Sequence, residues 1–151
     1  MAEGSVPEQL HTVLVVDDDD GVRRVVGQWV ERLGYHTRSA GSADQALEIL
    51  SHEEVAVALC DIRMPDKDGI WLADQIRARF ASVAIVLVTG LHEMDAAFTL
   101  RPGIVGYITK PFEREAISGA IRHALEWHQA PSHEPAPAES LLDAVSRWDA
   151  P

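Results

Sequence analysis

The sequence is poor in basic residues, in cysteine and in long apolar runs. Its 151 residues include 13 Lys and Arg against 24 Asp and Glu, giving a formal net charge of −11 at pH 7. Only Lys67 and Lys110 are lysines and the arginines are scattered, so direct nucleic-acid binding is disfavoured. The single cysteine, Cys60, forms no internal disulfide, which fits a reducing cytoplasm. No run approaches the ~20 apolar residues that span a bilayer, and residues 1–10 lack the features of a signal peptide, so neither membrane insertion nor secretion is expected.

Four short apolar runs predict the strands of a sheet. They are continuous rather than alternating, so each strand must be covered on both faces, as in a parallel sheet between two layers of helices. A fifth and more polar run, Tyr35–Ala40, suits an edge strand. The four apolar runs are Val13–Val16, Val55–Cys60, Val83–Val88 and Ile104–Ile108.

Segments of helical period separate these runs, so the chain is a strand–helix unit repeated five times. Ser42 and Gln45 form a capping box that predicts a helix from Ala43, and we expect Asp19 or Asp20 to cap the first helix. Because strand–helix–strand crossovers are right-handed, the pattern predicts a doubly wound α/β fold with five parallel strands and a ligand site beyond their carboxyl ends. The other expected helices are Val22–Leu33, Leu72–Phe80, Glu93–Leu100 and Glu113–His128.

The composition changes near the C-terminus. Prolines among Ala, Ser, His and Glu mark residues 129–151 as a linker or tail, so we assign one domain to residues 11–128 and a short tail to residues 1–10. The C-terminal tail contains three apolar residues at near-helical spacing, namely Leu141, Val145 and Trp148. Such a short helix is marginal alone, so a frayed tail or the start of a further element is the simpler interpretation, and docking on a partner is the alternative.

Polar residues come to one edge of the predicted sheet from four of its strands. Carboxylates on neighbouring strands repel and raise one another's pKa unless a cation lies between them. Oxygen ligands with room for water and phosphate oxygens indicate Mg²⁺ rather than Ca²⁺ or a softer metal. An aspartate nucleophile, a hydroxyl and an ammonium then suit phosphoryl transfer without a general base. The residues concerned are Asp17, Asp18, Asp61, Thr89 and Lys110.

The segments VLVVDD, CDIRMPDKDG, VLVTG and GYITKPF, in this order and spacing, closely resemble the receiver domain of bacterial response regulators over roughly residues 13–125. The resemblance implies strand order 2-1-3-4-5 and a phosphoacceptor at Asp61. It also implies that Mg²⁺ is bound by Asp61, by Asp18 directly, by Asp17 through water and by the backbone carbonyl of Arg63.

The resemblance further implies a switch that is a regulatory domain rather than an enzyme. Lys110 and Thr89 would bind the phosphoryl oxygens, Thr89 would move toward the phosphate, and the aromatic ring of Tyr107 would turn inward. Pro111 matches a cis peptide of the family, whereas Leu91 is a variable position.

Partners follow from the same resemblance. A sensor histidine kinase or phosphotransfer protein would supply the phosphoryl group. The surface formed by Glu93–Leu100, Ile104–Ile108 and Glu113–His128 would then control an output domain or partner protein, or pair with a second copy.

Two alternatives remain from the residues alone. A phosphatase of the haloacid dehalogenase type also uses an aspartate nucleophile, and Asp17 with Asp19 satisfies its DxD spacing. That hypothesis requires a further acidic cluster after Lys110 and leaves Asp61 without a role. A pure adaptor that uses the same surface without phosphorylation is disfavoured, because the polar set is complete.

Overall fold

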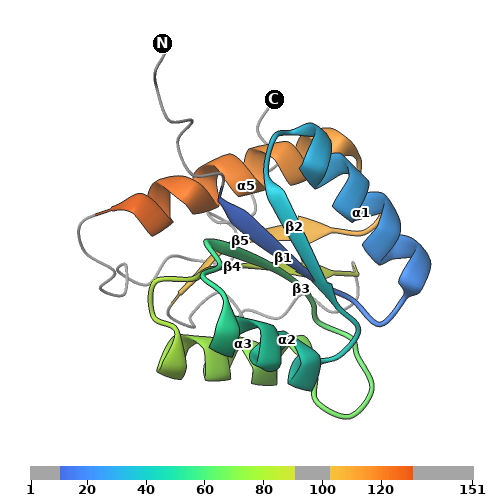
Figure 1. Cartoon of the computed structure of the whole chain (residues 1–151). Helices are drawn as coiled ribbons and strands as arrows, with labels where there is room; N and C mark the ends of the chain where they lie inside the picture. The colour runs from blue at the N-terminus through green and yellow to red at the C-terminus, as the bar shows by residue number, and fades with distance from the viewer. Residues whose placement is uncertain (1–10, 91–102, 131–151) are drawn as a thin grey trace.

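The computed structural model describes residues 11–90 and 103–130 and contains one sheet of five parallel strands. The strand order is β2-β1-β3-β4-β5, which confirms the predicted fold. Helices α1 and α5 cover one face of the sheet, and α2 and α3 cover the other (Figure 1). The tails at residues 1–10 and 131–151, and the expected helix Glu93–Leu100, lie outside the described residues. Among the helices described, none is long and apolar enough to cross a lipid bilayer. The strands are β1 Thr12–Val16, β2 His36–Ala40, β3 Val57–Asp61, β4 Ala84–Thr89 and β5 Ile104–Thr109, and the helices are α1 Asp20–Arg32, α2 Ala43–His52, α3 Gly69–Arg79 and α5 Arg114–Gln129.

Two apolar layers explain why the central strands are apolar at every position. In β1, Val13 and Val15 belong to the layer beneath α1 and α5, whereas Leu14 belongs to the layer beneath α2 and α3. Fully burying a valine or leucine side chain stabilises a fold by about 1.5–3 kcal/mol, so both layers contribute substantially. Strand β2 keeps most of its side chains in contact with solvent, which confirms that it is an edge strand.

The helix starts follow the predicted capping residues. The side chain of Asp19 accepts a hydrogen bond from the amide of Val22, 3.1 Å away, and caps α1. Ser42 Oγ accepts a hydrogen bond from the amide of Gln45, also at 3.1 Å, and α2 begins at Ala43 as predicted. The second half of the capping box differs from expectation, because Gln45 Oε1 accepts from the amide of Gly41 rather than from Ser42.

Strands β3 and β4 extend one residue beyond the apolar runs that predicted them. Asp61 is the last residue of β3 and lies in register with Val88, and Thr89 is the last residue of β4. Backbone hydrogen bonds continue past both ends, from the amide of Ile62 to the Val88 carbonyl (3.0 Å) and from the amide of Lys110 to the Thr89 carbonyl (2.7 Å). Backbone pairing does not depend on side-chain polarity. The apolar runs therefore predicted strands that end one residue too early, before the polar residues Asp61 and Thr89. Asp61 and Thr89 are therefore held by the sheet rather than by a loop.

A bulge in β5 determines which layer its side chains enter. Ile104 and Gly106 pair with successive residues of β4, so Val105 is an extra residue in the ladder. After this bulge, Tyr107 lies in the layer beneath α2 and α3, and Ile108 lies in the layer beneath α1 and α5. Tyr107 is thereby directed into the core.

Candidate functional site

Three carboxylates meet at the carboxyl edge of the sheet. Asp17 follows β1, Asp18 is next to it in the loop, and Asp61 ends the neighbouring strand β3. One carboxylate oxygen from each residue lies within 4.8 Å of the others. Asp17 and Asp61 are only 3% and 4% exposed, whereas Asp18 is exposed. The structure therefore brings together the three acids that the strand pattern placed at one edge, and these residues could hold a metal ion.

Lys110 adds a positive charge to this acidic cluster. Its Nζ lies 3.2 Å from Asp61 Oδ1 and 3.7 Å from Asp17 Oδ2. The Lys110–Pro111 peptide bond is cis, as the resemblance implied. The lysine side chain is 37% exposed, so it lies at the border between the buried acids and solvent. The ammonium is placed where it can neutralise an anion bound next to Asp61.

The Asp61 carboxylate is costly to ionise in this position. The pKa of Asp61 is raised to about 6, chiefly by burial and also by the negative charge of Asp17, although the nearby Lys110 partly counteracts both effects. Three acids face one ammonium, so the cluster has surplus negative charge when all of them are ionised. Carboxylate oxygens without histidine or thiolate ligands are the donor set that suits a hard divalent cation such as Mg²⁺.

The two predicted switch residues lie on adjacent strands beside the acidic cluster. Thr89 is fully buried, and its hydroxyl donates to the carbonyl of Gly90 at 3.0 Å. Tyr107 is 5% exposed and is in register with Leu87 of β4, within the apolar layer beneath α2 and α3. In this structure the aromatic side chain of Tyr107 is inward, and the Thr89 hydroxyl is bonded to the carbonyl of the next residue.

The loop after β3 packs tightly against the backbone of Asp61. The amide of Gly69 donates to the Ile62 carbonyl at 2.9 Å. A Cβ atom at position 69 would lie 2.3 Å from the carbonyl oxygen of Asp61, so only glycine fits without a shift of the backbone. Met64 is buried in the core and anchors the loop, whereas the side chain of Arg63 is exposed. The close approach at Gly69 fixes the path of the chain that leaves Asp61.

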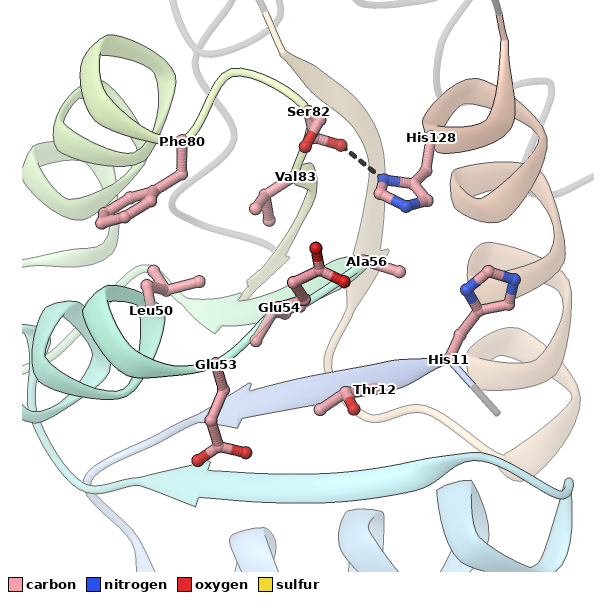
Figure 2. A pocket seen from close by; sticks show the side chains of 11 residues that line it. His11, Thr12, Leu50, Glu53, Glu54, Ala56, Phe80, Ser82, Val83 and His128 are labelled. Atoms are coloured by element: carbon pink, nitrogen blue, oxygen red, sulfur yellow. Dashed lines mark hydrogen bonds between the residues drawn. The ribbon is translucent and has the colours of Figure 1, made fainter. Parts of the chain in front are cut away.

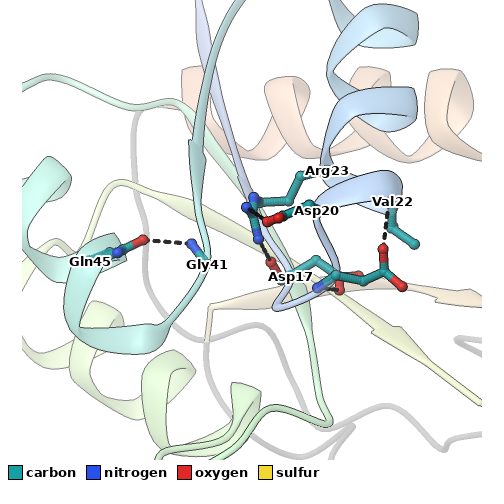
Figure 3. A network of polar contacts seen from close by, with 7 residues as sticks. Asp17, Asp20, Val22, Arg23, Gly41 and Gln45 are labelled. Carbon is teal, nitrogen blue, oxygen red and sulfur yellow. Dashed lines mark hydrogen bonds and ion pairs between the residues drawn. The ribbon is translucent and has the colours of Figure 1, made fainter.

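Arg23 is a component of the site that the sequence analysis missed. From the first turn of α1, its Nη1 donates to the carbonyl of Asp17 at 2.6 Å, and its guanidinium also pairs with Asp20 (Figure 3). The carboxylate of Asp17 also accepts a hydrogen bond from the backbone amide of Asp19 at 2.9 Å, which is a second restraint on this loop. The spacing of Asp20 and Arg23 indicates a surface ion pair, but the bond to the Asp17 carbonyl depends on the path of the loop. Together these contacts position the acidic loop.

Comparison with known protein sequences agrees with this geometry. Residues 13–122 match the sequence model of a family described as the response regulator receiver domain. The DNA-binding transcriptional regulator NtrC of Proteus hauseri is 33% identical over 139 residues, which are 91% of this chain and 29% of that protein. The transcriptional regulatory protein AruR of Pseudomonas aeruginosa is 38% identical over 125 residues, which are 74% of this chain and 51% of that protein. The chain thus spans about half or less of the length of these curated relatives.

Solved structures show the same architecture. A CheY-like response regulator receiver domain protein from Methanospirillum hungatei JF-1 superposes with a TM-score of 0.75 at 28% identity, covering 80% of this chain and 98% of that chain. The receiver domain of NtrX from Brucella abortus gives a TM-score of 0.71 at 29% identity, covering 76% of this chain and 98% of that one. The similarity therefore extends over nearly the whole of both solved domains.

The alternative of a haloacid-dehalogenase-type phosphatase receives no support from these comparisons. It requires Asp17 to be the nucleophile, yet Oδ1 of Asp17 already accepts a hydrogen bond from the backbone amide of Asp19. It also gives no role to Asp61, whose Oδ1 lies 3.2 Å from the ammonium of Lys110.

Proposed function

Because this chain belongs to the response regulator receiver domain family, we propose that its switch is set by a phosphoryl group on Asp61. The observation that carries this assignment is the position of the Asp61 carboxylate. It is buried, it lies within 4.8 Å of the oxygens of Asp17 and Asp18, and one of its own oxygens is 3.2 Å from the ammonium of Lys110. A phosphoryl group on Asp61 would therefore have an ammonium and a candidate cation site beside it.

We assign the Mg²⁺ site to Asp17, Asp18 and Asp61, with the Arg63 carbonyl as a further ligand. When bound, the ion supplies positive charge that offsets both the acids and the transferred phosphoryl group. Arg23 acts through Asp17, because its bond to the Asp17 carbonyl holds the loop that presents the acids.

Phosphoryl transfer then requires little more than positioning. One oxygen of Asp61 attacks phosphorus, so that a P–O bond forms while the bond to the leaving group of a phosphohistidine or an acyl phosphate breaks. Lys110 neutralises one phosphoryl oxygen. The hydroxyl of Thr89 leaves the Gly90 carbonyl and donates to another phosphoryl oxygen. That movement changes the packing next to Tyr107 on β5 and couples the site to the domain surface.

One proposed partner acts before the phosphorylation of Asp61 and another acts after it. A sensor histidine kinase or a phosphotransfer protein in the cytoplasm supplies the phosphoryl group. The surface that includes β5 and α5, together with the expected helix Glu93–Leu100, then contacts an output domain, a partner protein or a second copy. Because the whole chain has a formal net charge of −11, we expect no direct contact with nucleic acid.

Labelling with a small phosphodonor tests the assignment. Incubation with Mg²⁺ and radiolabelled acetyl phosphate should label the wild-type protein and not Asp61→Asn. Asp66→Asn is the matched control, because Asp66 is an exposed acid of the same loop at φ 69°, a conformation that asparagine tolerates. Removal of divalent cations with EDTA should abolish labelling. Equal labelling of the wild type and Asp61→Asn would refute the proposal.

A further inference from the structure

The loop that joins β5 to α5, residues 110–113, begins with the lysine of the acidic cluster. The bond from the amide of Lys110 to the Thr89 carbonyl, 2.7 Å long, ties the start of this loop to β4. In the described part of the chain, Glu113 at the N-cap of α5 forms no side-chain cap hydrogen bond, whereas side chains cap the other three helices. The second half of the loop therefore depends on a contact other than a helix cap.

That contact is made with Trp29 of α1. The rings of Trp29 and Phe112 meet edge to face, with centroids 6.2 Å apart and planes at 79°, which is a favoured geometry for two aromatic side chains. Phe112 is half-buried against the apolar layer beneath α1 and α5, whereas Pro111 and Glu113 on either side of it are exposed. Phe112 is therefore the side chain through which the loop packs on the domain, and Trp29 is the ring it meets.

Helix α1 thus contacts both charged sides of the site. In its first turn, Arg23 Nη1 donates to the Asp17 carbonyl at 2.6 Å and restrains the acidic loop. Further along the same helix, Trp29 contacts the loop that carries the lysine. The helix is itself fixed, because two valines on its inner face are buried in the layer against the sheet. One rigid element can therefore set the position of the ammonium relative to the acids.

The other end of α5 is held independently of Trp29. Nδ1 of His128 lies 2.6 Å from the carbonyl of Ser82, in the loop before β4 (Figure 2). The rings of His128 and His11 meet edge to face with centroids 5.9 Å apart, beside a pocket of about 380 Å³ at the amino edge of the sheet. Loss of the contact between Trp29 and Phe112 would therefore loosen residues 110–113 without detaching α5.

We infer that Trp29 is a positioning residue whose ring, through Phe112, holds the backbone that places the Lys110 ammonium against Asp61. The side chain of Lys110 is long and 37% exposed, so the 3.2 Å approach of its Nζ to Asp61 Oδ1 depends on where the backbone of the loop lies. A displaced ammonium would interact with the acids less strongly, because the attraction falls with distance and with exposure to water. The consequence for phosphorylation rests on the proposed function, whereas the effect on Lys110 does not.

NMR relaxation of the lysine side chains tests the inference in the metal-free, full-length protein. The chain has two lysines, so labelling lysine Cε with ¹³C gives one signal from Lys110 and one from Lys67. Trp29→Ala should lower the order parameter of the Lys110 signal by about a third, because the loop loses its packing contact. The Lys67 signal should not change, since Lys67 pairs with Asp44 at 2.9 Å. Trp29→Phe keeps a ring and should keep most of the order of Lys110.

Two further variants separate positioning from general packing. Phe112→Ala removes the other ring and should loosen Lys110 as much as Trp29→Ala does, and the double variant should loosen it no further. Trp127→Ala is the matched control, because Trp127 packs against the same apolar layer but lies about 20 Å along α5 from its first residue. This control should leave the Lys110 signal unchanged.

The rate of phosphorylation gives a second readout. With Mg²⁺ and radiolabelled acetyl phosphate, the initial rate of labelling should fall about threefold to tenfold in Trp29→Ala, the range that one aromatic pair can supply. Trp29→Phe and Trp127→Ala should label at nearly the wild-type rate.

Two outcomes would overturn the inference. Unchanged order of Lys110 in both Trp29→Ala and Phe112→Ala would show that the bond to the Thr89 carbonyl holds the lysine by itself. Equal loosening in Trp127→Ala would show a general effect of lost packing. Failure of the proposed function would look different, because Asp61→Asn would then be labelled like the wild type while the Lys110 signal still depended on Trp29.

Discussion

The ammonium of Lys110 lies 3.2 Å from a carboxylate oxygen of Asp61, although β4 lies between β3, which ends at Asp61, and β5, which Lys110 follows. The contact is possible because parallel strands end at one edge, where a long side chain after β5 can reach across the end of β4. The same ammonium is 3.7 Å from Asp17, so the charge of Lys110 stabilises the ionised forms of two buried acids. The ionisation of Asp61 should therefore depend on Lys110, on Asp17 and on any added cation.

Removing the ammonium should raise the pKa of Asp61 above its value of about 6. Lys110 lowers that pKa by its charge and by its hydrogen bond, whereas burial and Asp17 continue to raise it. We expect Lys110→Met to raise the pKa by about one unit, which a carboxyl ¹³C NMR titration in the absence of divalent cations measures. Lys67→Met is the matched control, because Lys67 is the other lysine and pairs with Asp44 away from the acidic cluster. An unchanged Asp61 titration in Lys110→Met would show that the pair is not coupled.

Asp61→Asn should stabilise the metal-free fold above pH 6. The folded state binds a proton at Asp61 more tightly than the unfolded state does, because its pKa is raised from 3.8 to about 6. Wild-type stability should therefore fall as pH rises from about 4 to about 6, by as much as about 3 kcal/mol at 1.36 kcal/mol per unit, and the asparagine variant should lack this fall. Urea unfolding in EDTA at pH 4 and pH 7 measures the difference. A variant no more stable than the wild type at pH 7 would contradict the proposed cost of the buried charge.

Mg²⁺ binding should weaken in acid. The ion competes with the proton held by Asp61, so apparent affinity should change little above pH 7 and fall about tenfold from pH 7 to pH 5. Isothermal titration calorimetry at the two pH values measures this ratio. Arg23→Met should weaken binding at both pH values without altering the ratio, since Arg23 holds the Asp17 carbonyl and not Asp61. Equal affinity at pH 5 and pH 7 would exclude Asp61 as a ligand.

Gly69→Ala should damage the site and the fold together. The added methyl group would lie 2.3 Å from the Asp61 carbonyl oxygen, and the required backbone shift costs about 1–3 kcal/mol. Gly119→Ala is the matched control, because nothing lies within 4 Å of a Cβ there and alanine favours a helix by about 1 kcal/mol. Thermal unfolding and acetyl phosphate labelling of both variants measure the two effects. A Gly69→Ala protein as stable and as readily labelled as the wild type would show that the close approach is unimportant.

Much of the fold and the position of the acids could be predicted because both follow from one pattern. Continuous apolar runs require a parallel sheet between helices, and the ends of parallel strands bring Asp17, Asp61 and Lys110 to one edge. The final residues of β3 and β4 were missed because Asp61 and Thr89 are polar, although backbone pairing continues through them.

Other features depend on loop paths that residue types do not reveal. The bond from Arg23 to the Asp17 carbonyl and the bond from Thr89 to the Gly90 carbonyl involve backbone oxygens, whose directions are set only by the folded loops. The contact between His11 and His128 joins the two ends of the domain and has no signal in local sequence.

Chemical mapping of the phosphorylated residue tests the central claim most directly. After reaction with acetyl phosphate and Mg²⁺, borohydride converts an aspartyl phosphate to homoserine, which mass spectrometry locates in the chain. The account predicts homoserine at position 61 in the wild type and in Asp66→Asn, with aspartate retained at positions 17 and 18. Homoserine at position 17 or 18, with Asp61 unmodified, would contradict it.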